Sequence, residues 1–262
     1  MLAEKNSYFS SLPTPLKALW ARNMILREVK KGAPIDLARH SGKVYFPVTS
    51  LAAMSVINPA GSSTFIRFSG ANAAVGLADS LTADSTNGGQ RGLLRCVQHW
   101  CCSGYTFELP WQVVFDSLSE INRVSTKATY SHLMIEILVM RLHCAETHSA
   151  EQQLASLLLE AKRFIRDDGV LGFTHRELAS FLSTRRETVS DFISEWESAG
   201  IVECTRGKLV VKSEPRLCDI ACACHRYSQD IELHRKTLWS SISWKSVVSS
   251  PQRDTQPTLE IR

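Results

Sequence analysis

The most regular hydrophobic pattern in the chain lies between residues 174 and 211. Apolar residues first recur there every three or four positions, as on the buried face of an α-helix. This spacing predicts two short helices with the inward-facing residues Leu178, Ala179, Leu182, Val189, Ile193 and Trp196. Each helix begins with Thr-x-x-Glu, at Thr174 and at Thr184, a sequence that can form a capping box. Two capped helices joined by a tight turn make a helix-turn-helix unit.

Beyond Ala199-Gly200, which predicts the end of the second helix, the pattern changes to two short apolar runs. Residues 200–204 and 208–211 are expected to be strands joined by a turn at Thr205-Arg206-Gly207. A hairpin in this position makes a winged unit whose tip carries Arg206 and Lys208, placed to meet phosphate oxygens. The alternative is an ordinary hairpin that closes a small core.

The outward positions of the second helix are polar and charged. They begin with Arg185, Arg186, Glu187 and Ser190. An arginine can donate two hydrogen bonds to guanine, and a glutamate can accept one from cytosine, so the helix at about 185–199 is a candidate for reading bases. Capped helix pairs with polar outer faces also occur in structural bundles. The pattern alone therefore leaves both interpretations open.

These motifs, in this order, resemble the C-terminal half of the CRP/FNR family of bacterial transcription regulators. The resemblance rests on Thr-x-x-Glu-Leu-Ala from residue 174, the run 186–190, Ala199-Gly200-Ile201 and the run 206–209. It extends to Cys-Ala-Cys-His-Arg-Tyr at 222–227, which is similar to a tail motif on a final helix in one branch of the family. The resemblance covers about residues 174–227.

The resemblance implies roles for individual residues. Arg186 and Glu187 fall on base-reading positions of the family, and Thr188 falls on a phosphate contact. Asp191 stands where the family often has a second arginine, so the target sequence is expected to differ from the best-known family operator. The candidate DNA-binding residues are Thr174, Arg185, Arg186, Glu187, Thr188, Ser190, Asp191, Arg206 and Lys208.

The charge of this region is balanced. Residues 174–216 contain seven Lys or Arg and seven Asp or Glu, and the whole chain carries a net charge of only +4. DNA-binding domains often have a basic surface. A ligand-binding or protein-interaction module with a vestigial winged domain that no longer reads DNA is therefore the alternative. An enzyme is not expected, because no nucleophile elbow, P-loop, HExxH or dinucleotide fingerprint is found.

The N-terminal half consists of short apolar runs separated by Gly, Asn, Pro and Ser. Strands are expected at 44–46, 52–57, 64–68, 92–97 and 105–109, with a turn at 58–61. Such spacing suggests a β-sandwich or barrel, and the family resemblance implies a β-roll like that of cyclic-nucleotide-binding domains. The expected fold class is therefore α+β.

The effector of this β-roll is unknown. Family members that bind cyclic AMP carry Gly-Glu-Leu-Ala followed by an arginine that pairs with the cyclic phosphate. The corresponding stretch here is Gly76-Leu77-Ala78-Asp79-Ser80, which lacks the glutamate. Arg91 could meet a phosphate, but residues 87–90 before it resemble a loop. We expect no cyclic-nucleotide pocket of the family type.

Eight cysteines are scattered along the chain without a CxxC pair. One group joins Cys96, Cys101 and Cys102 with His99, and another joins Cys218, Cys222 and Cys224 with His225. Adjacent Cys101 and Cys102 should point to opposite faces of a strand, and Cys224 should lie off the helical face shared by Cys218 and Cys222. We interpret both groups as packing residues, with redox sensing by the first as the alternative, and identify no metal site or cofactor.

Residues 122–147 are predicted to form one long helix. A narrow apolar seam runs along it through Ala128, Ser131, Ile135, Leu138, Leu142 and Ala145. The family resemblance favours a two-fold dimer through this helix, whereas the alternative is that the seam packs on its own β-domain. A break at 146–149 predicts a hinge, after which Ser149 caps a helix containing Leu154, Leu157, Leu158 and Ile165.

We therefore expect a sensor or effector β-roll at 1–120, a dimerisation helix and hinge at 121–148, a winged helix-turn-helix domain at 149–239 and a disordered tail at 240–262. Neither a signal-peptide pattern nor a membrane-spanning run is found, which predicts a cytoplasmic protein without a membrane partner. The expected function is sequence-specific transcription regulation as a homodimer on an inverted-repeat operator. Activation would also require contact with RNA polymerase.

Overall fold

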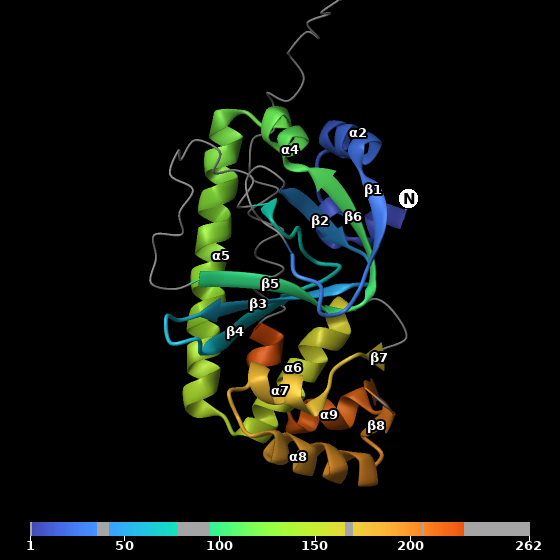
Figure 1. The fold of residues 1–262 in the computed structure, drawn as a ribbon, viewed down its shortest axis with the longest axis vertical. Coiled ribbons are helices and arrows are strands. Elements are labelled where there is room, and N and C mark those ends of the chain that lie inside the picture. Colours follow the sequence, from blue (N-terminus) through green and yellow to red (C-terminus); the bar gives the residue numbers. More distant parts are fainter. Residues whose placement is uncertain (1, 36–41, 78–94, 166–169, 206, 228–262) are drawn as a thin grey trace, which may run out of the picture.

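The computed structural model describes residues 2–35, 42–77, 95–165, 170–205 and 207–227 (Figure 1). Several sequence predictions fall outside these residues. They concern residues 78–94, which include Arg91, residue 206 and residues 240–262. The described chain is a mixture of helices and antiparallel sheets, with helices and a winged unit at its C-terminal end. The predicted α+β fold class is confirmed.

Among the described residues, the N-terminal part contains two three-stranded antiparallel sheets, in the orders β1-β6-β2 and β4-β3-β5. Their bounds are β1 Ile25–Val29, β2 Lys43–Pro47, β3 Leu51–Ile57, β4 Ser63–Ser69, β5 Arg95–Cys102 and β6 Gly104–Pro110. All five predicted strands correspond to strands of the structure. The fourth, predicted at 92–97, can be compared only at 95–97, which belong to β5. The predicted turn at 58–61 joins β3 to β4, and Gly61 adopts a positive φ of 85° there.

β1 and the short helices around the sheet β1-β6-β2 were not predicted from the sequence. Four of the five residues of β1 are exposed, so the strand lacks an alternating apolar face. The helical elements are η1 Leu2–Lys5, α1 Ser7–Ser10, α2 Thr14–Asn23 and α4 Trp111–Ser117. They bury Trp20 and Phe9 against Phe46 of β2.

One long helix, α5 (Glu120–Thr147), runs along one side of the molecule beside the N-terminal sheets (Figure 1). It confirms the predicted helix. Its buried residues are Asn122, Thr126, Leu133, Met140 and Cys144. The six residues of the predicted seam are all exposed. The alternative in which this seam packs on its own β-domain is therefore wrong.

After the predicted break, α6 (Ala150–Phe164) begins with a capping box between Ser149 and Gln152. The break is stabilised by Arg141 of α5, which donates hydrogen bonds to Glu160 of α6 and to the carbonyl oxygen of Ile66. Leu154, Leu157 and Leu158 are fully buried, as predicted. Ile165 is also buried, one residue beyond the end of the helix.

The C-terminal part contains α7 (His175–Phe181), α8 (Arg186–Ser198) and a hairpin of β8 (Val202–Thr205) and β9 (Lys208–Val211). A short strand, β7 (Val170–Leu171), pairs with β9, and α9 (Glu214–Ile220) follows the hairpin. This is the predicted helix-turn-helix followed by a wing. Among the described helices, none combines the length and the apolar character needed to cross a membrane.

A shared hydrophobic core connects the N-terminal sheet β4-β3-β5 with α6 and the helix-turn-helix. Phe65 and Phe68 of β4 contact Phe181 of α7, with ring centroids 4.7 and 5.3 Å away. Phe173 stacks on Phe68 at 5.6 Å. The division of the chain into domains remains a prediction. Besides this shared core, the N-terminal half has a second hydrophobic cluster around Trp20, Phe46 and Leu109.

Candidate functional site

The start of α7 is fixed by the predicted capping box at Thr174. The Thr174 hydroxyl oxygen accepts a hydrogen bond from the Glu177 backbone N–H at 3.2 Å. In return, Oε2 of Glu177 accepts hydrogen bonds from the Thr174 N–H at 2.7 Å and from its hydroxyl at 2.8 Å. Two backbone donors that would otherwise be unsatisfied at this helix end are thereby bonded.

The turn between the helices contains the only non-glycine residue with a positive φ in the described chain, Ser183 at 52°. The Thr184 N–H then donates to the Ala179 carbonyl at 3.0 Å. The second predicted capping box, at Thr184, is wrong: Arg185 occupies the N-cap, and no capping side chain is found there among the described residues. Because the helix starts one residue later than expected, Glu187 is at its second position and cannot close the box.

The second helix, α8, presents charged residues to solvent and apolar residues to the core. Val189, Ile193 and Trp196 are buried as predicted. The exposed candidates are Arg185, Arg186, Glu187 and Asp191, and Thr188 is half-buried. The side chains of Arg185, Arg186, Glu187 and Asp191 are thus accessible to solvent.

Ser190 differs from the other candidates on α8. Its hydroxyl donates to the carbonyl of Arg186 at 3.0 Å and lies 2.9 Å from Nδ1 of His175 on α7. This side chain is therefore engaged in holding the two helices together.

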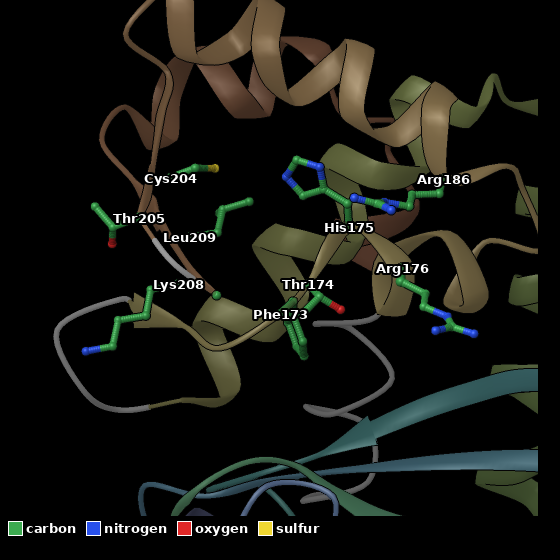
Figure 2. A pocket seen from close by; sticks show the side chains of 10 residues that line it. Phe173, Thr174, His175, Arg176, Arg186, Cys204, Thr205, Lys208 and Leu209 are labelled. Atoms are coloured by element: carbon green, nitrogen blue, oxygen red, sulfur yellow. The ribbon is translucent and has the colours of Figure 1, made fainter.

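The wing lies beside the first turn of α8. Gly207 supplies a positive φ of 71° in its turn, and Lys208 is exposed. Arg206 lies outside the described residues. A cavity of about 370 Å³ separates the wing from α7 and α8 (Figure 2). Lys208 lines it from the wing, and His175, Arg176 and Arg186 line it from the helices (Figure 2).

His175 and Arg176 were not identified from the sequence. They occupy the first two positions of α7, where Arg176 is exposed and His175 is half-buried against Ser190 of α8. The capping box at Thr174 could have indicated them. Together with Arg186 and Lys208 they line one concave surface with three basic side chains and one histidine.

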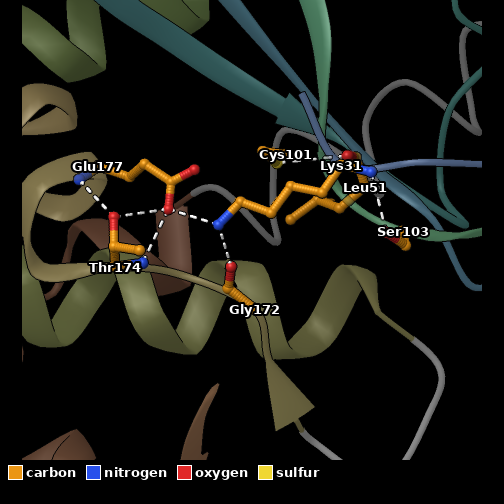
Figure 3. A network of polar contacts seen from close by, with 7 residues as sticks. All are labelled: Lys31, Leu51, Cys101, Ser103, Gly172, Thr174 and Glu177. Carbon is orange, nitrogen blue, oxygen red and sulfur yellow. Dashed lines mark hydrogen bonds and ion pairs between the residues drawn. The ribbon is translucent and has the colours of Figure 1, made fainter. Parts of the chain in front are cut away.

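The N-terminal part of the chain reaches this site through Lys31 (Figure 3). Its Nζ atom lies 2.6 Å from Oε2 of Glu177 and also donates to the carbonyl of Gly172. Burial raises the pKa of Glu177, but the hydrogen bonds from Lys31 and Thr174 outweigh it, and the pKa is lowered overall. The ionised carboxylate therefore links the two halves of the molecule.

The paired cysteines of β5 differ from the expectation that they face opposite ways. Leu51 pairs with Cys102 while Ala52 pairs with Trp100, so Cys101 is the extra residue of a β-bulge. Both cysteines are buried in the shared core, and the Cys101 thiol donates to the Leu51 carbonyl at 3.3 Å (Figure 3). Their packing role agrees with our interpretation, whereas the predicted orientation is wrong.

The C-terminal part of the chain matches a known family model. The model of the Crp-like helix-turn-helix domain matches residues 152–220. The matched segment begins in α6 and ends with α9, so it contains the capping box, both helices of the site and the wing. No curated protein matches the chain significantly.

Solved structures of CRP/FNR regulators share the fold of most of the chain. FixK2 from Bradyrhizobium japonicum is 16% identical, covers 76% of this chain and 98% of its own, and has a TM-score of 0.57. A CRP/FNR-family transcriptional regulator from Thermus thermophilus is 18% identical, with coverages of 75% and 98% and a TM-score of 0.54. The c-di-GMP-responsive global regulator CLP of Xanthomonas campestris is 10% identical, with coverages of 77% and 100% and a TM-score of 0.53. The predicted resemblance to this family is thus confirmed, and at these identities the structures show the common fold.

Proposed function

We propose that the protein is a sequence-specific DNA-binding transcription regulator that acts as a homodimer. The observation that carries the proposal is the exposed, positively charged first turn of α8 beside the wing of a Crp-like helix-turn-helix domain. In this geometry the second helix can enter the major groove while the wing meets the phosphate backbone. No catalytic step is proposed.

Individual contacts follow from the positions of the side chains. Arg186, at the first position of α8, is proposed to donate to guanine O6 and N7. Glu187 is proposed to accept from cytosine, and Arg185, Thr174 and Thr188 to contact bases or phosphates nearby. On the wing, Arg206 and Lys208 are proposed to contact phosphate. Exposed Asp191 would repel phosphate, so it favours a base contact and an unusual operator.

The Ser190 hydroxyl already has hydrogen-bonding partners within the protein, so Ser190 is proposed to position α8 and not to contact DNA. Its hydrogen bond to the Arg186 carbonyl and its contact with His175 orient the first turn of α8 against α7. His175 and Arg176 are added to the proposed surface because they line the same cavity as Arg186. Neutral net charge in this region is compatible with binding, since three of its seven basic residues, Arg176, Arg186 and Lys208, line one concave face.

The exposed face of α5 supports a dimer. Ile135, Leu138 and Leu142 are 60%, 45% and 63% exposed on one side of the helix. Helical spacing brings Ile121, Val124 and Val139 close to the same side. Burying this stripe against a second copy removes apolar surface from water, and the two-fold symmetry would place two α8 helices about one DNA turn apart on an inverted repeat.

The alternative is an interaction or ligand-binding module whose winged domain no longer reads DNA. It is favoured by the equal numbers of acidic and basic residues at 174–216. RNA polymerase would be a further partner of an activator. We propose no effector.

Selection of binding sites from random double-stranded DNA tests the proposal. The wild-type protein should enrich an inverted repeat, and Arg186→Ala should lose about 1–3 kcal/mol, or roughly 5- to 150-fold in affinity, with relaxed preference at one base position. Lys208→Ala should weaken specific and scrambled DNA alike and reduce the salt dependence. Arg22→Ala, which removes an exposed arginine from α2, is the control for charge. Wild-type affinity and specificity of Arg186→Ala would refute the base-reading role, and no enrichment at low salt would favour the alternative.

A further inference from the structure

Four side chains that can bind a metal converge where α5 ends. Cys144 lies in the last turn of α5, His148 lies in the break before α6, and Cys222 and Cys224 follow the end of α9. Their thiol sulfurs and a ring nitrogen of His148 all lie within 4.8 Å of one another. Three segments separated by up to 80 residues in sequence therefore bring their ligand atoms to one point.

The distances suit a single tetrahedral ion. Zinc–sulfur bonds of about 2.3 Å and zinc–nitrogen bonds of about 2.0–2.1 Å place tetrahedral ligand sulfurs about 3.8 Å apart, and a sulfur and a nitrogen about 3.5 Å apart. In the structure, the sulfurs of Cys144 and Cys222 are 3.6 Å apart. The sulfur of Cys224 and Nδ1 of His148 are also 3.6 Å apart. Both pairs agree with this geometry within a few tenths of an ångström.

A disulfide does not account for the cluster. None of the three cysteines, all of which the structure describes, is in a disulfide. The separation of 3.6 Å between the Cys144 and Cys222 sulfurs exceeds the disulfide bond length of about 2.05 Å. Simple core packing would explain buried thiols, but it requires neither a half-buried imidazole nor the approach of four ligand atoms.

Neighbouring groups orient the ligands. The Ser156 hydroxyl of α6 lies 3.0 Å from the Cys222 sulfur and donates to the Cys222 carbonyl at 3.2 Å. Nδ1 of buried His225 lies 2.7 Å from the same carbonyl. These contacts hold the segment after α9 in place, as outer-shell hydrogen bonds do around metal centres.

We propose that Cys144, His148, Cys222 and Cys224 form a binding site for one zinc ion. Three thiolates and one imidazole form a ligand set typical of structural zinc sites, and hard ions such as Mg²⁺ and Ca²⁺ prefer oxygen ligands. The bound ion would join the end of α5, the interhelical break and the segment after α9. It would thereby fix the C-terminal domain to the long helix.

A path for the ion exists on one side of the cluster. A cavity of about 560 Å³ is lined by His148 and Cys224 together with His143, Arg226 and Tyr227. The ion can therefore enter without unfolding of the shared core. On the opposite side, Cys144 and Cys222 are buried, which shields the site from competing ligands.

Zinc titration of the full-length protein tests this proposal. The chain is reduced, stripped with a chelator and titrated with Zn²⁺ by calorimetry, and Co²⁺ is used as a spectroscopic probe. We expect one Zn²⁺ per chain, and sulfur-to-cobalt charge-transfer bands with the intense visible absorption of tetrahedral Co²⁺. Cys144→Ser and Cys222→Ser should each weaken binding by about 100-fold or more, because loss of even an outer-shell partner costs about 10–100-fold.

Two further variants separate metal binding from folding. Cys204→Ser changes a half-buried cysteine of β8 outside the cluster and should leave zinc binding unchanged. His148→Cys keeps four ligands, so it should retain the ion but shift the Co²⁺ spectrum towards four-sulfur coordination. The proposal is overturned if the reduced wild-type chain binds no zinc, if the ligand variants bind as the wild type does, or if the His148→Cys spectrum is unchanged. Formation of a Cys144–Cys222 disulfide in the presence of excess Zn²⁺ would also overturn it.

Discussion

Replacement of Gly70 by alanine tests how tightly the two halves of the molecule are packed. Gly70 follows β4, and an added Cβ atom would lie 2.5 Å from the Phe164 carbonyl oxygen and 2.8 Å from the Phe164 Cβ. Phe164 is the last residue of α6, and its carbonyl accepts a hydrogen bond from the Ala71 N–H at 3.0 Å. The backbone of the N-terminal sheet therefore touches the backbone of α6 at this position.

The expected cost follows from these distances. The carbonyl oxygen must retreat by about 0.9 Å to reach ordinary contact, which begins at 3.4 Å. Because a backbone atom cannot rotate away as a side-chain tip can, the α6 end must shift and the Ala71 hydrogen bond must lengthen. Inserting a methyl group into such a packed position costs about 1–3 kcal/mol. In a chain of this size, that loss lowers the thermal midpoint by about 2–12 °C.

The assay is thermal unfolding followed by circular dichroism, with Gly172→Ala as the matched control. At Gly172 the nearest atom to an added Cβ is the Cys102 sulfur at 3.9 Å, so there is room for the methyl group. This control should unfold at the wild-type temperature or slightly above it, since alanine restricts the unfolded chain. Equal midpoints for the two variants would refute the close backbone contact.

Two other predictions concern α5 and the Lys31 link. Leu142→Asp should convert the proposed dimer to a monomer in sedimentation experiments, because it places a charge on the exposed seam. Leu19→Asp, at an exposed position of α2, is the control and should remain dimeric. Dimerisation of both variants would show that the seam is not the dimer interface. Lys31→Met should cost about 1 kcal/mol at pH 7. The pKa of folded Glu177 is lowered below its ordinary 4.5, so its stabilisation is present above that pH and is lost on acidification through the lowered value. Chemical denaturation should therefore show the Lys31→Met difference at pH 7 and its disappearance at lower pH, and a pH-independent difference would contradict the ionic link.

The helix-turn-helix could be predicted because its determinants are local. The Thr174 capping box and the spacing of Leu178, Val189 and Ile193 depend on residues within one or two turns of each other. The start of α8 could not be predicted, because the left-handed Ser183 shifts it by one residue. A serine carries no strong signal for that conformation.

Features that depend on distant contacts were not visible in the sequence. The Lys31–Glu177 pair spans 146 residues, and β1, which ends two residues before Lys31, has no apolar alternation to reveal it. Cys144 and Cys222 are 78 residues apart, and the i, i+4 relation of Cys218 and Cys222 was misleading because α9 ends at Ile220. Periodicity describes one element at a time and cannot report where two elements meet.

The Glu177 carboxylate has a consequence for communication within the molecule. A single oxygen accepts hydrogen bonds from Thr174 at the start of α7 and from Lys31 of the N-terminal half. If the Lys31 contact stabilises the first turn of α7, an event that withdraws Lys31 destabilises that turn. By thermodynamic reciprocity, any event that orders α7 strengthens the hold on Lys31 by the same free energy. The stability of the N-terminal end of α7 therefore depends on contacts in both halves of the molecule. This coupling does not require a hinge motion.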